Sequence, residues 1–136
     1  MKTLAITTLI LFAASLTALA ASIDGKWTSE REVLDADGKT YKHTTTLTLK
    51  SEAGSLTGTV VQVSAAPWMQ ERTGRVVEIR DGKLDGDKFS FKITYTLNDG
   101  DRTAIYEGTV EGDHMQGIVK FRGVGQTWTL DAKRAD

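Results

Sequence analysis

Cysteine is absent from this sequence of 136 residues, and proline occurs only once. A chain without cysteine forms no disulfide, has no thiolate metal site and offers no thiol nucleophile. Its stability must therefore come from a hydrophobic core without covalent cross-links.

An excess of charge of either sign is also missing. The chain has 17 Lys and Arg against 18 Asp and Glu, with a formal net charge of −1. Basic and acidic residues are interspersed along the sequence. A nucleic-acid-binding domain normally concentrates basic residues. Beyond the N-terminal segment no apolar run is long enough to span a bilayer. We expect no nucleic-acid partner and no membrane span; a protein partner stays unknown.

The N-terminal segment has the composition of a secretory signal. Met1-Lys2 supplies a positive start, Leu4–Leu19 is almost wholly apolar, and Ala18-Leu19-Ala20 fits the small-x-small cleavage pattern. We therefore predict a signal peptide at residues 1–20, cleavage near Ala20, and one domain over residues 21–136. The mature protein is expected to be secreted or periplasmic.

Alternating apolar and polar residues dominate the rest of the chain. In the clearest case, every second residue from Phe89 to Leu97 is apolar and the residues between are polar. This period of two is typical of a strand with one buried face. We predict eight strands, at Trp27–Val33, Tyr41–Leu49, Leu56–Val63, Arg75–Leu84, Phe89–Leu97, Thr103–Glu111, Met115–Phe121 and Gln126–Lys133.

Tight turns connect several of these strands. Gly86-Asp87, Asp99-Gly100 and Gly112-Asp113 have the residues of two-residue hairpin loops. The pairs that follow are Leu84 with Phe89, Tyr95 with Ala104, Phe91 with Gly108, and Val110 with Met115. Each pair puts apolar or small side chains on a common face, as a correct register requires.

One strand departs from strict alternation. Ile79 and Leu84 are both apolar but have opposite parity, so they cannot face the same side of a regular strand. A β-bulge inserts one residue and restores the parity. We expect a bulge at Asp81-Gly82.

Eight short strands joined by consecutive turns predict an all-β, antiparallel up-and-down meander. Left open, such a sheet exposes two edges, and closure into a barrel removes them. An eight-stranded barrel is just wide enough to be filled by side chains or to hold one small ligand.

The meander assigns each inward residue to one end of the barrel. The closed end receives only apolar side chains: Trp27, Leu47, Leu49, Leu56, Phe89, Val110, Met115 and Leu130. The open end mixes polar and aromatic side chains: Arg31, His43, Gln62, Tyr95, Leu97, Tyr106, Phe121 and Trp128. The one long loop, Ser64–Thr73, lies over the open end and carries Trp68.

An apolar floor below a few polar groups is typical of a small-molecule site. The candidate ligand-binding residues are Arg31, His43, Gln62, Trp68, Tyr95, Tyr106 and Trp128. The same pattern is equally consistent with a filled core, in which the polar tips reach water and Gly58, Gly108 and Gly117 make room for the rings of Trp27 and Phe91.

Catalytic and metal-binding patterns are missing. The two histidines, His43 and His114, are far apart in sequence, and no serine lies in a nucleophile-elbow motif. The Asp81–Asp87 carboxylates belong to hairpin turns and lack the spacing of a calcium loop. We expect a protein that is not an enzyme and has no cofactor and no metal.

Gly25-Lys26-Trp27 opens the first predicted strand and Lys133-Arg134 closes the last. This pair of motifs resembles the signature of the calycins, the lipocalins and avidin-like proteins among them, in which a basic residue from the last strand packs across the indole. Leu56-Thr-Gly-Thr-Val60 and Trp128 followed by Ala132-Lys133-Arg134 also resemble small secreted bacterial barrels of uncharacterised function. The resemblance implies a calycin-like barrel and places Lys133 or Arg134 over Trp27. The avidin biotin site has no matching motif here.

Two functions follow from these observations. The first is noncatalytic binding of a small apolar or amphipathic molecule at the open end of the barrel. The alternative is a secreted protein-interaction or structural barrel with a filled core and no small-molecule ligand. A hollow that reaches His43 and Tyr106 favours the first, and a lumen filled by Trp27, Phe91 and Trp128 favours the second.

Overall fold

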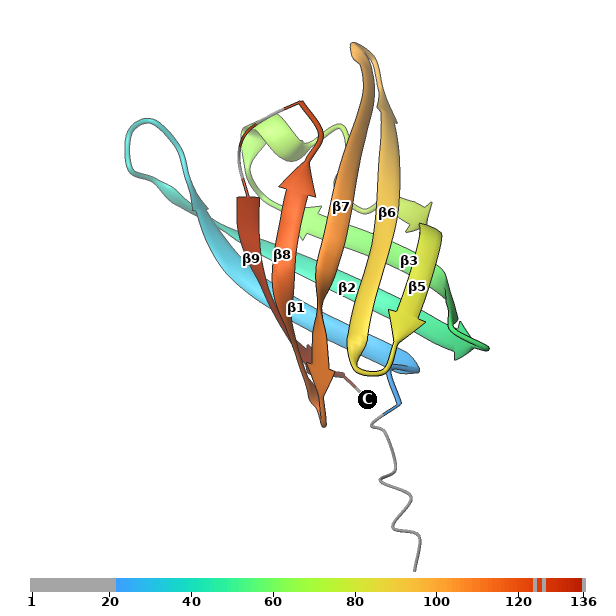
Figure 1. Cartoon of the computed structure of the whole chain (residues 1–136). Coiled ribbons are helices and arrows are strands. Elements are labelled where there is room, and N and C mark those ends of the chain that lie inside the picture. Colours follow the sequence, from blue (N-terminus) through green and yellow to red (C-terminus); the bar gives the residue numbers. More distant parts are fainter. Residues whose placement is uncertain (1–21, 124, 126, 136) are drawn as a thin grey trace, which may run out of the picture.

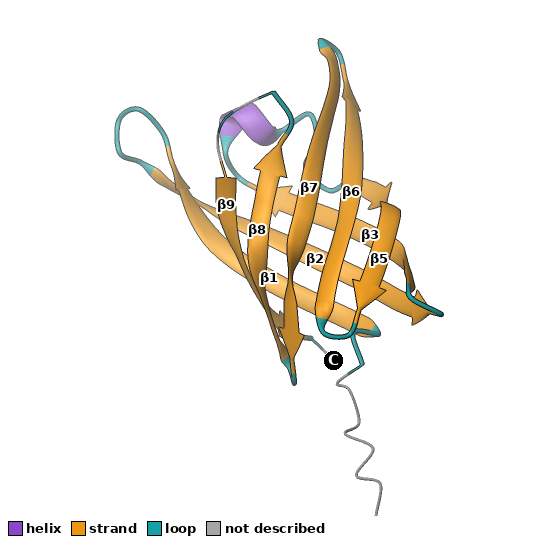
Figure 2. Ribbon diagram, viewed as in Figure 1, coloured by secondary structure: helices purple, strands orange, loops and turns teal. Residues whose placement is uncertain are grey.

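The computed structural model describes residues 22–123, 125 and 127–135. The expected signal peptide and its cleavage point lie outside these residues. The described residues form one sheet of nine strands and a short 3-10 helix, η1 (Pro67–Met69), which Figure 2 distinguishes by colour. The strands are β1 (Gly25–Leu34), β2 (Thr40–Glu52), β3 (Ser55–Ser64), β4 (Val76–Glu78), β5 (Arg80–Asp85), β6 (Lys88–Leu97), β7 (Gly100–Glu111), β8 (His114–Phe121) and β9 (Thr127–Arg134).

The sheet closes into a barrel. With the exception of β4 and β5, strands that follow each other in sequence are antiparallel neighbours, and the ring closes where β1 pairs with β9. Both β4 and β5 pair with β3, so together they fill one place and the barrel has eight strand positions. Figure 1 shows β1, β2 and β3 crossing behind β5–β9. The predicted all-β, eight-stranded antiparallel meander is confirmed.

The predicted bulge interrupts the fourth strand position. Arg80 pairs with Lys92 and Lys83 pairs with Ser90, so β5 has one residue more than β6 over this stretch. The extra residue bends the chain through Asp81, whose φ is +52°. The bulge therefore explains why the apolar residues on its two sides have opposite parity.

Two hairpins have the predicted register and one does not. Leu84 pairs with Phe89, and Val110 pairs with Met115, as expected. In the β6–β7 hairpin, however, Tyr95 pairs with Arg102 instead of Ala104. The reason is that the loop lies one residue earlier than predicted, at Asn98-Asp99, and Gly100 already belongs to β7.

The same change of register pairs Phe91 with Tyr106, where Gly108 was predicted, and Gly108 lies opposite Phe89. The pairing moves by two residues, and side chains alternate with a period of two. The inward face of both strands is therefore the one that the sequence predicted.

The closed end of the barrel is filled by apolar side chains. All eight residues predicted to fill it are buried: Trp27, Leu47, Leu49, Leu56, Phe89, Val110, Met115 and Leu130. Trp27 is wholly buried, and its indole nitrogen donates a hydrogen bond to the carbonyl oxygen of Ile23 at 2.9 Å. This end is solid.

A basic residue covers Trp27, as predicted. The guanidinium carbon of Arg134 lies 4.4 Å from the centre of the indole ring. The same guanidinium donates hydrogen bonds to the carbonyl oxygens of Asp24 at 2.7 Å and Ser22 at 2.5 Å, and it forms an ion pair with Asp113. Arg134 therefore links the last strand to the segment that precedes the first.

Three inward glycines allow neighbouring strands to approach closely. Gly108 and Gly117 lie opposite each other on β7 and β8. A Cβ on Gly117 would lie 2.0 Å from the carbonyl oxygen of Glu107, and one on Gly58 would lie 1.9 Å from that of Thr48. These contacts are with the backbone of the adjacent strand, so the glycines permit strand packing at bends of the barrel.

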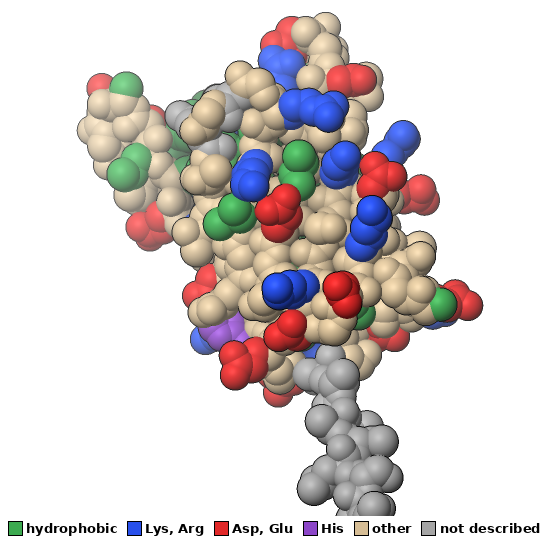
Figure 3. All heavy atoms as spheres, in the orientation of Figure 1, with side chains coloured by type: hydrophobic (Ala, Val, Ile, Leu, Met, Phe, Trp, Pro, Cys, Tyr) green, Lys and Arg blue, Asp and Glu red, His purple; other side chains and the backbone are tan. Residues whose placement is uncertain are grey.

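The outer surface carries charges of both signs. Figure 3 shows basic and acidic side chains interspersed over the face formed by β5–β9. Cross-strand ion pairs such as Lys120 with Glu107 and Lys42 with Glu30 belong to this exposed surface. The part of the chain that the structure describes contains no helix that is long and apolar enough to cross a membrane.

Candidate ligand-binding site

The open end of the barrel contains a cavity of about 400 Å³. Small-molecule sites typically have volumes of about 300–1,000 Å³. Strands β1–β3, the loop after β3, and strands β7–β9 all contribute side chains to it. The inward and loop residues that line it are Ser29, Arg31, Val33, His43, Thr45, Gln62, Trp68, Met69, Arg72, Tyr106, Val119, Phe121, Trp128 and Leu130.

The cavity also opens sideways through the seam between β1 and β9. These strands form backbone pairs only at Trp27 with Arg134 and Thr28 with Lys133, next to the closed end. Farther along, the outward-facing residues Glu32, Leu34 and Thr129 line the cavity. Figure 1 shows the β1–β2 hairpin diverging from β9 here. Outward-facing residues of β1 and β9 thus contribute to the cavity lining beyond the point where the two strands stop pairing.

Arg31 spans this seam. Its guanidinium carbon lies 4.9 Å from the centre of the Trp128 ring, a cation–π contact that joins β1 to β9 where backbone pairing has ended. Burial lowers the pKa of Arg31, and the nearby positive charge of Arg72 lowers it further, while Tyr106 has the opposite effect. The guanidinium is thus a partly desolvated cation at the entrance to the cavity.

One wall of the cavity is polar. Gln62 on β3 accepts a hydrogen bond from the Tyr95 hydroxyl at 3.0 Å, and it donates one from Nε2 to the Tyr106 hydroxyl at 3.2 Å. Burial raises the pKa of Tyr95 to about 12 and also raises that of Tyr106. Both phenols are therefore protonated at neutral pH. The network fixes the Gln62 amide, and Tyr106 presents a hydroxyl to the cavity.

His43 is also buried in this wall, with 1% of its surface exposed. Its Nε2 lies 3.5 Å from the Thr45 hydroxyl, and its Nδ1 has no hydrogen-bond partner among the described residues. Burial lowers the pKa of His43 to about 4, and the positive charges of Arg31 and Arg72 contribute to the shift. The imidazole is therefore neutral at pH 7.

The lowered pKa predicts a pH dependence of stability. An unfolded chain binds a proton on His43 near its ordinary pKa of about 6.5, whereas the folded protein does so only near 4. The stability that neutral His43 contributes is fully present above the pKa of the unfolded chain. It is lost as the pH falls towards the pKa of the folded protein. We expect wild type to lose about 2 kcal/mol of unfolding free energy between about pH 7.5 and pH 5 relative to His43→Gln.

Urea denaturation of both proteins across this pH range measures the difference directly. The carboxylates common to both proteins titrate in each and cancel in the comparison. Parallel curves for wild type and His43→Gln would show that the folded protein does not depress the pKa of His43.

The opposite wall is apolar and aromatic. Val119 on β8 and Leu130 on β9 are buried, and the rings of Phe121 and Trp128 meet edge to face with their centres 4.3 Å apart. Met69 from η1 is 4% exposed and completes this wall. The cavity thus has two chemically different sides, which suits a molecule with both polar and apolar parts.

The loop that contributes Met69 is held by hydrogen bonds to the end of β3. The Thr73 hydroxyl accepts a bond from the amide of Ser64 at 2.9 Å, and the Gln70 side chain donates to the carbonyl oxygens of Ser64 and Ala66 at 3.0 and 2.9 Å. Pro67 begins the 3-10 helix within this closed loop. Met69 is thereby directed inward.

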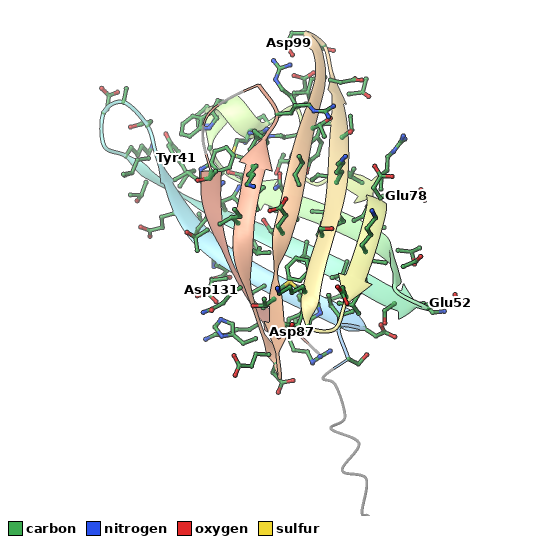
Figure 4. All side chains as sticks on the ribbon, viewed as in Figure 1. Tyr41, Glu52, Glu78, Asp87, Asp99 and Asp131 are labelled. Carbon is green, nitrogen blue, oxygen red and sulfur yellow. The ribbon has the colours of Figure 1, made fainter. Side chains whose placement is uncertain are left out.

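The same loop leaves Trp68 at the rim, where it is 51% exposed. Its ring meets the edge of the Tyr41 ring, with the centres 5.6 Å apart. Figure 4 labels Tyr41 on the β1–β2 hairpin and Asp99 at the tip of the β6–β7 hairpin, with Asp87 near the other end of the barrel. Trp68 lines the cavity, and Tyr41 supports its ring from the β1–β2 hairpin.

Six of the seven candidate residues from the sequence line this cavity: Arg31, His43, Gln62, Trp68, Tyr106 and Trp128. Tyr95 does not line it, and instead supports Gln62 from behind. The sequence analysis did not single out Ser29, Thr45 or Arg72. Ser29 and Thr45 have the same parity as Arg31 and His43, so alternation could have identified them; Arg72 belongs to an irregular loop that has no such pattern.

The second histidine lies away from the cavity. The Nε2 atom of His114 is within hydrogen-bond reach of the Asp131 carboxylate, between β8 and β9, and both side chains are substantially exposed. Among the residues that the structure describes, no group of three or more His, Asp or Glu side chains is placed to hold a metal ion.

The fold and the cavity together define a closed antiparallel meander barrel with one solid and one hollow end. Comparison with protein-family models, curated protein sequences and solved structures gives no match to this chain.

Proposed function

We propose that this protein is a secreted or periplasmic, noncatalytic barrel that binds one small amphipathic molecule at its open end. The observation that carries the proposal is the cavity itself, with polar groups on β1–β3 and apolar groups on β8, β9 and η1. Its floor is the packed apolar closed end. The proposed export is based on the N-terminal apolar segment of the sequence.

Kinship with the calycins is part of this proposal. Three features support it: the meander barrel, the Gly25-Lys26-Trp27 start of β1, and the Arg134 guanidinium over the Trp27 indole. Fold alone does not define a ligand, so the ligand class must come from the side chains of the cavity.

The polar groups of the cavity suit binding better than catalysis. His43 has a pKa of about 4 and is a weak base, and its nearest hydroxyl partner, on Thr45, is at 3.5 Å. A general base works best when its pKa lies near the working pH, with the acceptor within hydrogen-bond reach of the proton it removes. These groups are therefore suited to orienting a bound molecule.

The test is to fill the cavity. Ser29 is small, 9% exposed and lines the cavity, so Ser29→Trp places an indole where the ligand would lie. We expect wild type to bind the uncharged fluorescent probe N-phenyl-1-naphthylamine saturably, with one site per chain. Ser29→Trp should lose this binding.

Ser55→Trp is the matched control, because Ser55 is exposed at the start of β3 and is not a cavity residue. Thermal melting of all three proteins checks that they fold. Wild type that binds no probe would contradict the proposal, and so would a folded Ser29→Trp variant that binds as wild type does.

The alternative, a protein-interaction barrel, is favoured by the exposure of Trp68 and Leu34 at the mouth. The same experiment separates the two functions. A partner that docks on the rim leaves no saturable probe site in the interior, and Trp68→Ala would then weaken partner binding while the cavity variant would not.

A further inference from the structure

The cavity holds more positive charge than its own residues neutralise. Arg31 and Arg72 both line it. Within the described residues, none of the ion pairs includes either guanidinium. The one carboxylate residue of the lining, Glu32, has an exposed side chain on the outward face of β1.

Each guanidinium rests on an aromatic ring of the apolar wall. Arg31 lies 4.9 Å from the centre of the Trp128 ring, and Arg72 lies 6.0 Å from that of Phe121. The Nε atom of Arg72 is buried without a hydrogen-bond partner. A ring holds a guanidinium by contact with its flat face. The N–H groups point outward in the plane of the guanidinium, where an anion can accept hydrogen bonds from them.

His43 is a third polar residue of the cavity lining. Its side chain is 1% exposed, and its Nδ1 atom is buried and has no hydrogen-bond partner among the described residues. Arg31, Arg72 and His43 all line the cavity; burial lowers the pKa of His43, and the charges of the two arginines lower it further. A buried polar atom is normally hydrogen-bonded, so this atom is suited to a polar ligand.

We infer that the molecule bound in the cavity is a carboxylic acid with an apolar body, whose carboxylate lies between Arg31 and Arg72 and whose hydrocarbon part lies along Val119, Leu130 and Met69. Guanidinium groups bind carboxylates through paired, charge-assisted hydrogen bonds. One anion offsets the mutual repulsion of the two cations, which a neutral ligand cannot do. The inference rests on the proposed function and names its ligand class.

Three ligands with the same eight-carbon chain test this class: octanoate, octanol and octyltrimethylammonium. Isothermal titration calorimetry near neutral pH and low salt measures each affinity. We expect octanoate to bind roughly tenfold or more tightly than octanol, and octyltrimethylammonium to bind least. The preference for octanoate should decrease as salt is added, because screening weakens charge attraction at the partly exposed mouth.

The double variant Arg31→Gln with Arg72→Gln should remove the preference while keeping the affinity for octanol. Arg122→Gln is the control, since Arg122 is an exposed arginine beyond β8 that does not line the cavity. It should retain the preference. If the double variant melts at a lower temperature than wild type, the single variants Arg31→Gln and Arg72→Gln give the same comparison, and each should reduce the preference.

The outcomes distinguish the two proposals. Equal binding of octanoate and octanol by wild type, or an unchanged preference in the folded Arg→Gln variants, overturns the carboxylate inference and leaves small-molecule binding intact. Failure of wild type to bind any of the three ligands or the naphthylamine probe overturns both.

Discussion

Trp27→Ala is expected to lower the free energy of unfolding by about 3–5 kcal/mol, the usual range for removing a large buried aromatic side chain. Trp27 has no exposed surface, lies opposite Leu47 on β2, and has the Arg134 guanidinium over its ring. The substitution removes the indole from the core and also the ring on which the guanidinium rests. Denaturant unfolding of purified protein measures the change.

Trp68→Ala is the matched control for this experiment. The chemical change is identical, but Trp68 is 51% exposed at the rim. A substitution at an exposed position usually changes stability by less than about 0.5 kcal/mol, to which the edge contact with Tyr41 adds little. Similar unfolding curves for Trp27→Ala and wild type would mean that the closed end is not the packed core described above.

Gly117→Ala is expected to destabilise the barrel by about 3 kcal/mol, the upper end of the range for overpacking. The added methyl group would lie 2.0 Å from the carbonyl oxygen of Glu107 and 2.8 Å from the Cα of Gly108, both on the neighbouring strand. Relief of this overlap requires movement of the β7 or β8 backbone, because neither contact is with a flexible side chain. The β7–β8 ladder would then separate locally.

Gly125→Ala makes the same chemical change in open space, since no atom lies within 4 Å of a Cβ at that position. We expect it to unfold within about 0.5 kcal/mol of wild type. Hydrogen exchange of the β7 and β8 amides should increase in Gly117→Ala and not in Gly125→Ala. Equal stability of the two variants would contradict the close strand approach at Gly117.

Much of the fold could be predicted from alternation and turn residues. Burial of one face of a strand makes every second residue apolar. The inward-facing residues of β6, from Phe89 to Leu97, could therefore be predicted from the sequence. Parity also revealed the bulge near Asp81. The register of the β6–β7 hairpin was wrong because adjacent loop positions at Asn98, Asp99 and Gly100 all have turn-forming residues, and only the conformation shows which two form the loop.

The site was predictable where it lies on regular strands. Arg31, His43, Gln62, Tyr106 and Trp128 follow from alternation and from the direction of the meander. Arg72 was not predictable, because its position depends on the fold of the loop that Thr73 and Gln70 hold against β3. Whether the open end is hollow was also beyond the sequence, since it depends on how far β1 and β9 separate after Thr28.

The central claim is that a small molecule lies inside the open end of the barrel. The most direct test is a titration of isotope-labelled protein with octanoate, followed by backbone amide chemical shifts in NMR spectra. We expect saturable shifts at Ser29, Thr45 and Gln62, with the closed-end residues Leu49 and Leu56 unaffected. Shifts confined to the outer surface, or no shifts with octanoate, octanol or the naphthylamine probe, would contradict the claim.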